Sequence, residues 1–262
     1  MKTWIVITDL TRMQGKRVCL AGYTADCTCV RPVFRRPNGL TEDWLQASSQ
    51  GIIRPFAVVE FDLQQAMPEP PHTEDWLISP VYRVKRVLVP GGQRALLERI
   101  KDPSIEAIPG TAIRDEQGWY VNAGEGTRSL GTVEPKRVEG VHYIPREGGK
   151  SEYRLTFTDA EGKTYRLAVT DLAFRYCLDH LHAQEKIETQ EIARRLTTTL
   201  QEAQTFLRIG LTRGWEKHPD RCYLQITGVH TFPDYLEGRC YADFPQSQPS
   251  PRNSGTDEEI PF

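Results

Sequence analysis

Tyr153-Arg154-Leu155-Thr156-Phe157-Thr158 and Tyr165-Arg166-Leu167-Ala168-Val169 are the stretches that decide the fold. In each of them a large apolar residue alternates with a polar or small one, which is the period of a strand with one buried face. The residues between them, Asp159-Ala160-Glu161-Gly162, have the composition of a turn. The sequence therefore predicts a β-hairpin here.

A helix and a closing strand are expected after the hairpin, and residues 171–182 are expected to become helical. The helix is indicated by an apolar stripe, which consists of Ile192, Leu196, Leu200, Ala203 and Leu207. Thr189 is the expected N-cap, Glu191 lies in the first turn, and Gly210 is the expected stop. Cys222, Leu224 and Ile226 then alternate with polar residues in a final strand. Short antiparallel strands, a late helix and a closing strand fit a five-stranded oligonucleotide-binding (OB) barrel.

The first half of the chain has enough strand signals for another barrel. The expected strands are Trp4–Ile7, Arg17–Ala21, Cys29–Val33, Phe56–Leu63 and Tyr82–Val89, followed by a short helix within residues 94–100 and a hairpin within residues 112–121. The predicted fold class is mainly β with α: two small OB-like β-barrels, the second with a long helix, and a disordered tail. The expected domains are residues 1–137, 138–245 and 246–262.

Composition narrows the possible functions. The chain has 33 Lys and Arg against 35 Asp and Glu; without Arg252 and the three acids at 257–259, each count is 32. Because the body is neutral, a surface for nucleic acid requires an uneven distribution of charge. No apolar run approaches the roughly 18–20 residues of a membrane span, so we expect a cytoplasmic protein without membrane contact. The six cysteines form no Cys-x-x-Cys pair and are expected to be reduced.

One candidate surface for single-stranded nucleic acid lies early in the chain. Single strands bind to basic grooves that carry aromatic rings for base stacking. Basic and aromatic residues gather between residues 12 and 36, and the predicted binding set is Lys16, Arg17, Arg31, Phe34, Arg35 and Arg36. The alternative is a solvated turn region with scattered charge.

A second candidate surface lies near residues 210–217. Arg213 and Trp215 stand there between glycines and charged residues, so the indole is a candidate for base stacking. The alternative is that Trp215 plugs the end of a barrel.

The C-terminal stretch predicts a tether with an interaction site. Residues 246–255 are rich in Ser, Pro and Gln and lack apolar periodicity, which is typical of an unfolded segment. The last six residues are Asp257-Glu258-Glu259-Ile260-Pro261-Phe262. This tip resembles the C-terminus of bacterial single-stranded DNA-binding proteins, which recruits replication and repair enzymes. The alternative is an ordinary acidic tail that ends in Phe.

The body resembles the dual OB-domain family of prokaryotic defence and genome-conflict loci. The resemblance rests on Thr8-Asp9-Leu10-Thr11-Arg12, Arg17-Val18-Cys19-Leu20-Ala21-Gly22, Cys29-Val30-Arg31-Pro32-Val33 and Pro71-His72-Thr73-Glu74-Asp75-Trp76. It implies two barrels and nucleic-acid binding.

Catalysis is not expected. His72, Glu74 and Asp75 form the best local set for a metal, but they lack a matching partner, so neither a metal nor a cofactor is predicted. The main hypothesis is a protein that binds single-stranded nucleic acid, with DNA favoured, and whose tip recruits replication or repair enzymes. The alternative is a sensor or adaptor of a defence or genome-maintenance system that reads a nucleotide, a modified base or a protein.

Overall fold

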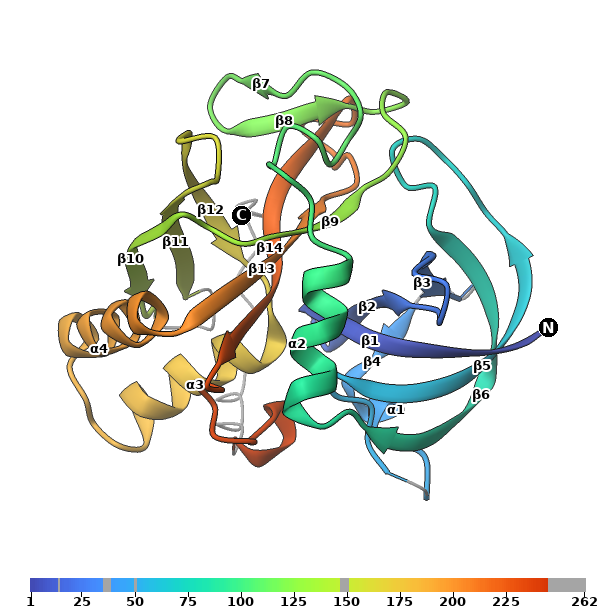
Figure 1. Ribbon diagram of the computed structural model, residues 1–262, viewed down its shortest axis with the longest axis horizontal. Helices are drawn as coiled ribbons and strands as arrows, with labels where there is room; N and C mark the ends of the chain where they lie inside the picture. The colour runs from blue at the N-terminus through green and yellow to red at the C-terminus, as the bar shows by residue number, and fades with distance from the viewer. Residues whose placement is uncertain (14, 35–38, 50, 147–150, 245–262) are drawn as a thin grey trace, which may run out of the picture.

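The N-terminal part of the chain forms a closed barrel. The computed structural model describes residues 1–13, 15–34, 39–49, 51–146 and 151–244. The strands of this barrel are β1 (Lys2–Arg12), β2 (Arg17–Tyr23), β3 (Cys29–Val33), β5 (Ala57–Ala66) and β6 (Asp75–Val87). The ring runs β1-β2-β3-β6-β5 and returns to β1, and only its β3–β6 pairing is parallel (Figure 1). This is the Greek-key barrel that the sequence predicts.

A short segment connects the third and fourth strands of the first barrel. It contains β4 (Leu40–Thr41), which pairs with β2, and the helix α1 (Glu42–Leu45). The Thr41 hydroxyl accepts a hydrogen bond from the Trp44 amide and so caps the helix. The first barrel therefore has a helix between its third and fourth strands, although this helix is only four residues long.

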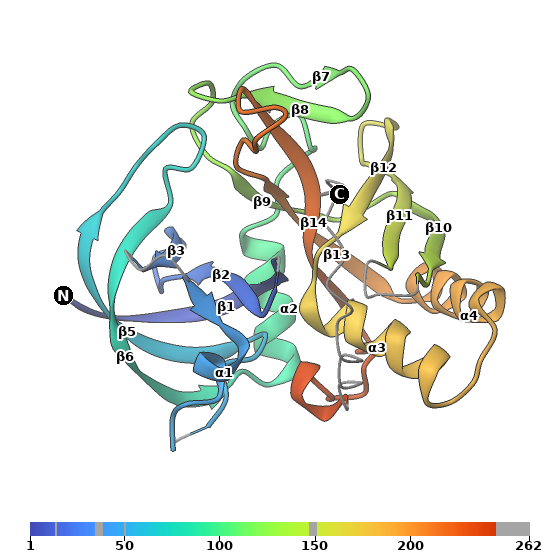
Figure 2. The ribbon, with the colours of Figure 1, turned by 180° about the vertical axis from the view of Figure 1, so that it is seen from behind.

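The second half of the chain repeats this strand order. Its strands are β10 (Arg137–Ile144), β11 (Glu152–Thr158), β12 (Thr164–Val169), β13 (Gln204–Leu211) and β14 (Arg221–Phe232). They lie in the order β10-β11-β12-β14-β13, again with a parallel pairing between the third and fifth strands. The helices α3 (Leu172–Ala183) and α4 (Thr189–Glu202) lie between the third and fourth strands (Figure 2).

The second sheet does not close into a ring as the first one does, because its path is interrupted between β9 and β10. β9 (Leu130–Val133) pairs with β13, whereas β10 pairs with β11, and only Glu134-Pro135-Lys136 separate β9 from β10. α2 (Pro90–Arg99) precedes this sheet, and the hairpin of β7 (Arg114–Asp115) and β8 (Trp119–Asn122) extends β14. The chain passes from the first sheet to the second between β6 and β7. The domain boundary near residue 137 stays a prediction.

The predicted long helix was placed too far along the chain. α4 ends at Glu202, Leu207 and Gly210 belong to β13, and the N-cap is Glu188 rather than Thr189. Nearly every residue of β13 is buried, because the first barrel covers its outward face, where Arg208 bonds Asp9 and Tyr23. The strand therefore lacks the two-residue period that would have identified it.

Helix α3 joins the two hydrophobic cores. Phe174 and Leu178 pack into the core of the second barrel. Leu172 and Tyr176 pack into that of the first. Asp171 caps the helix by accepting hydrogen bonds from the Ala173 and Phe174 amides. Because one helix serves both cores, the barrels are fixed against each other (Figure 1).

Buried charges also lie between the barrels. The Asp9 carboxylate of β1 and the Arg208 guanidinium of β13 are 2.9 Å apart, with side chains 2% and 0% exposed. Arg208 also donates to the Tyr23 hydroxyl and to the Thr132 hydroxyl. Burial opposes the charge on Arg208, but Asp9 and Tyr23 outweigh it and raise the pKa of the guanidinium.

Candidate nucleic-acid interface

The structure buries the central residue of the first predicted surface. The side chain of Arg31 is 7% exposed, and its Nε donates to the Asp75 carboxylate at 2.6 Å. Its Nη1 donates to the Ser129 hydroxyl, which belongs to the second barrel. The expectation that Arg31 lies in an open groove is therefore wrong, because the outward face of β3 is covered by the second barrel.

The other residues of that surface do not gather into a groove. Phe34 packs edge-on against Trp44, with ring centroids 5.2 Å apart. Lys16 is exposed and Arg17 is partly exposed, near the start of β2. Arg35 and Arg36 lie outside the described residues, as do all six residues of the C-terminal tip, Asp257, Glu258, Glu259, Ile260, Pro261 and Phe262. The binding roles given to these residues stay predictions.

The two barrels carry the same turn between their fourth and fifth strands. In the first barrel, Glu69 and His72 exchange backbone hydrogen bonds, and in the second, Trp215 and His218 do so. The first turn docks on the second barrel: the Glu74 carboxylate next to it accepts from the Ser129 amide at 2.6 Å. The second turn forms the rim of a cavity.

This cavity of about 260 Å³ lies on the outward face of the second sheet. Its lining combines aromatic rings, two arginines and two glutamines with small residues, and consists of Gln117, Gly118, Trp119, Arg154, Arg166, Leu167, Ala168, Thr212, Trp215, His218, Tyr223, Leu224 and Gln225. The barrel strands that contribute are β11, β12 and β14, the second, third and fifth of the barrel; Trp119 comes from β8. OB folds bind oligonucleotides on the face around strands two and three and with the loop between strands four and five.

The loop at the rim is held in a defined shape. Gly214 lies so close to Pro219 that an added Cβ would stand 2.1 Å from the Pro219 carbonyl oxygen. The Trp215 ring contacts the His218 ring at a centroid distance of 5.3 Å, and His218 contacts Tyr223 at 6.2 Å. Three aromatic side chains thus form a continuous, partly exposed ridge beside the cavity, which suits stacking of successive bases.

The arginines make the floor of this face positive. Arg166 is exposed on β12 and, within the described ranges, forms no ion pair, whereas Arg154 pairs with Glu152. Burial lowers the pKa of His142 on the neighbouring β10, and the charges of Arg166 and Arg154 lower it further. Burial is the largest of these causes of the lowered pKa, and the charge of Glu152 opposes them.

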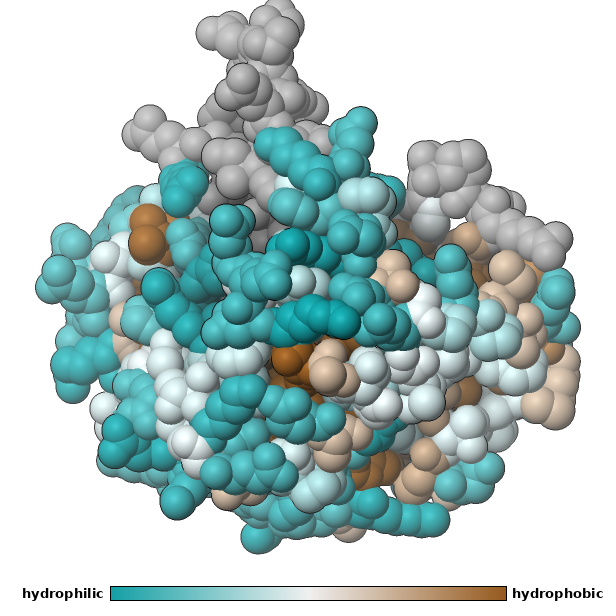
Figure 3. Space-filling model, turned by 90° about the horizontal axis from the view of Figure 1, so that it is seen from above, coloured by the Kyte–Doolittle hydropathy of each residue, from teal (hydrophilic) through white to brown (hydrophobic). Residues whose placement is uncertain are grey.

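The first barrel leaves only part of this sheet face open. Arg208 on β13 faces the first barrel, where it is fully buried. Tyr223 and Gln225 on β14 face the same side of the sheet but are partly exposed. The open part of the face is therefore limited to β11, β12 and the first half of β14. Seen from the end of the molecule that carries the β7–β8 hairpin, the surface is mainly hydrophilic, with small apolar recesses (Figure 3).

The matched strand order of the two barrels agrees with a comparison with known families. The model of the dual OB-containing domain matches residues 2–229. The chain belongs to this family. The match spans both barrels and the open face, and it confirms the resemblance seen in the sequence. A search of curated proteins found no match.

The sequence predicts only some of the residues that form this candidate interface of the dual OB-domain protein. It selected Trp215 and Arg213, and the structure places Trp215 at the cavity rim. Arg213 instead turns toward the first barrel, where it donates to the Asp75 carboxylate. Arg154 and Arg166 were missed, although both occupy the polar positions of the hairpin that identified the fold. Their outward direction was readable from that alternation; their proximity to Trp215 was not.

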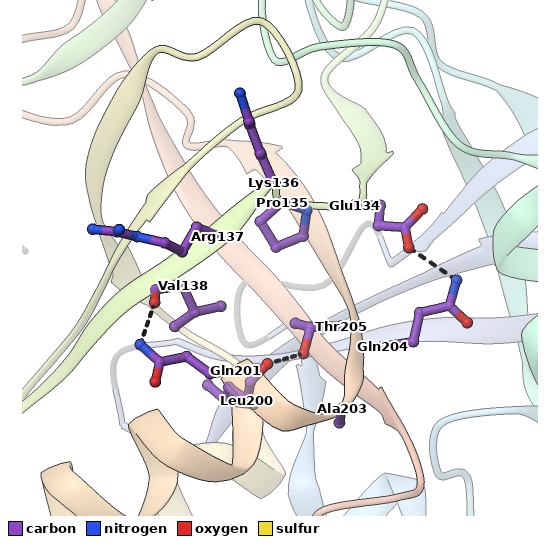
Figure 4. Close-up of a pocket in the computed structure, with 10 residues that line it drawn as sticks. All are labelled: Glu134, Pro135, Lys136, Arg137, Val138, Leu200, Gln201, Ala203, Gln204 and Thr205. Atoms are coloured by element: carbon purple, nitrogen blue, oxygen red, sulfur yellow. Dashed lines mark hydrogen bonds between the residues drawn. The ribbon is translucent and has the colours of Figure 1, made fainter.

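A second cavity of about 160 Å³ lies at the break between β9 and β10 (Figure 4). Two of its amide groups already donate hydrogen bonds: that of Gln204 to Glu134 at 2.9 Å, and that of Gln201 to the Val138 carbonyl at 2.8 Å. This cavity is smaller and lacks an aromatic wall, so it is the weaker candidate for a ligand.

His72, Glu74 and Asp75 are the best local set of metal ligands in the sequence, although no metal is predicted there. The structure places them in the contact between the barrels, where burial, followed by Arg31 and Arg213, lowers the pKa of His72 to about 3. In the part of the chain that the structure describes, no three His, Cys, Asp or Glu side chains are grouped to hold a metal. Within the same ranges, no helix is long and apolar enough to cross a membrane.

Proposed function

We propose that the open face of the second barrel binds single-stranded nucleic acid, with DNA as the expected polymer. The observation that carries this proposal is the meeting of Arg154 and Arg166 with Trp215, His218 and Tyr223 around one cavity. Cations attract the phosphates, and flat rings stack the bases. Membership of an OB family supports this choice, since OB barrels commonly bind oligonucleotides on this face.

The contacts available set the expected strength of binding. Each base–aromatic stack contributes about 1–3 kcal/mol by alanine substitution. Each phosphate neutralised on a single strand steepens the salt dependence by roughly 0.7 in the slope of log K against log salt. We expect substitution of Arg166 to reduce this slope, whereas substitution of Trp215 should weaken binding at all salt concentrations.

The test is a titration with labelled single-stranded DNA, single-stranded RNA and duplex at two salt concentrations. Arg166→Glu and Trp215→Ala should weaken binding of the single strand. Arg86→Glu is the matched control, because Arg86 is an exposed strand residue of the first barrel. If Arg166→Glu and Arg86→Glu have the same affinity as the unchanged protein, the proposed face is not the binding site.

We also propose that the protein acts by binding and recruitment rather than by catalysis. The C-terminal tip, residues 257–262, would hold a replication or repair enzyme beside the bound strand and raise its local concentration. Deleting these six residues should abolish binding of an enzyme that recognises such tips and leave the urea unfolding curve unchanged. Equal binding by the shortened chain would remove the recruitment part of the proposal.

A sensor of a single nucleotide, modified base or protein is the second candidate. The observation behind this candidate is that the cavity is a defined depression rather than a flat sheet, which suits a single nucleotide. Salt-insensitive binding of a mononucleotide, together with weak binding of oligonucleotides, would favour this candidate over the first.

A further inference from the structure

The cavity exists because small residues lie on its floor and aromatic residues on its walls. Ala168 of β12 pairs with Gln225 of β14, and both line the cavity. Trp119 enters from the β7–β8 hairpin, whereas Trp215 enters from the loop between β13 and β14. Two indoles from separate connections therefore border a floor on which one side chain is only a methyl group.

The wall from the β7–β8 hairpin is positioned by its turn. Gln117 has a φ of +58° and Gly118 a φ of +130°, so the chain reverses sharply over β14. A Cβ at Gly118 would lie 3.5 Å from the Tyr223 ring, which shows that the turn rests on this ring. The ammonium of Lys163, which directly precedes β12, lies 4.3 Å from the centroid of the Trp119 ring and supports that indole through a cation–π contact.

The polar groups of the cavity suit the edge of a base. Gln117 and Gln225 both line the cavity and are at least partly exposed, so each has a carboxamide available to a ligand. A carboxamide places a donor next to an acceptor, and glutamine uses this pair to bind adenine at N6 and N7. A volume of about 260 Å³ lies just below the range of drug-sized ligand pockets, so a single heterocycle is a suitable occupant.

We propose that this cavity is a socket for a single purine base, adenine above all, of the bound strand. Gln225 bonds the polar edge of the base, the indoles flank its ring, and Arg154 and Arg166 hold the phosphate beside it. This inference rests on the proposed function of the face and adds its specificity. It also supplies a reason for single-strand preference, because a base in a duplex must first be unpaired and unstacked at a cost of a few kcal/mol.

Filling the socket tests the inference. Ala168→Leu places a larger side chain on the floor, and Ala168→Ser is the control that nearly keeps the volume. Each variant is titrated with a short oligo-dA, an oligo-dT of equal length and a fully abasic oligonucleotide that has only sugar and phosphate. Ala168→Leu should weaken oligo-dA binding by roughly 5- to 150-fold, the equivalent of one stacked base, and leave abasic binding unchanged.

The role of Gln225 is tested by base preference. The unchanged protein should bind oligo-dA more tightly than oligo-dT, and Gln225→Ala should reduce this ratio while the salt slope stays the same. Equal binding of oligo-dA by Ala168→Leu and Ala168→Ser, or equal loss for oligo-dA and the abasic strand, overturns the socket. Absence of binding to every strand by the unchanged protein overturns the proposed function instead. Urea unfolding of each variant identifies a loss that comes from misfolding.

Discussion

Removing the charge of Asp9 should destabilise the whole protein. The Asp9 carboxylate bonds Arg208 at 2.9 Å, and Arg208 is fully buried between the barrels. In Asp9→Asn the guanidinium keeps its charge but loses the opposite charge that compensates for its burial. Breaking a buried ion pair in this way costs about 3–5 kcal/mol, which is a large share of a total stability of roughly 5–15 kcal/mol.

Urea unfolding followed by tryptophan fluorescence measures this loss. With a urea dependence of about 1–3 kcal/mol per M, a protein of this size is expected near the upper value, so the midpoint should fall by roughly 1–2 M. Replacing both partners, as Asp9→Leu with Arg208→Met, should cost less than the two single changes together, because no buried charge remains.

Glu191→Gln is the control for loss of an ion pair without burial. Glu191 bonds Arg194 and Arg195 on the exposed face of α4, where water screens the charges. Its removal should leave the midpoint unchanged. If Asp9→Asn also leaves the midpoint unchanged, or if the double variant loses as much as the two single variants combined, the argument from buried charge is wrong.

Two further predictions concern the turns between the fourth and fifth strands. The pKa of His72 is lowered to about 3 by burial and by Arg31 and Arg213, so below pH 6.5 only the unfolded chain takes up this proton. Lowering the pH from 6.5 to 5 should therefore reduce the free energy of unfolding by about 2 kcal/mol through His72. In His72→Gln, the urea midpoint should fall correspondingly less over this range. Parallel curves of urea midpoint against pH for the two proteins would contradict this. Gly214→Ala forces a Cβ against the Pro219 carbonyl, so it should displace the loop, lower the urea midpoint and weaken single-strand binding. Retention of full affinity by Gly214→Ala would show that the loop is not part of the interface.

Some elements were predictable because their signals are local. The strands Cys29–Val33 and Glu152–Thr158 were found at or near their true limits. Each residue of such a strand faces either a core or solvent, and the choice is written in its own side chain. The order of strands and helices then indicated OB barrels, which the structure and the family match confirm.

Charge placement was not predictable in this way. Arg31, Arg166 and Arg208 all occupy the outward positions of strands, and nothing in their neighbours along the chain distinguishes them. Arg166 is exposed, whereas Arg31 and Arg208 are buried with carboxylates 44 and 199 residues away in the sequence. Arg166 is a binding candidate that the sequence did not indicate, whereas Arg31 was a predicted binding residue and is buried between the barrels.

The sequence by itself determined two small barrels, because the alternation of apolar and polar residues fixes which face of each strand is buried in its own core. Only the tertiary structure decided which outward faces stay open. The docking of the two barrels covers Arg208 of β13 and Arg31 of β3, and it leaves β11, β12 and the first half of β14 to carry the candidate interface. The reason is physical: a strand's pattern records its contact with its own core, while cover from a second barrel depends on residues far away in the chain.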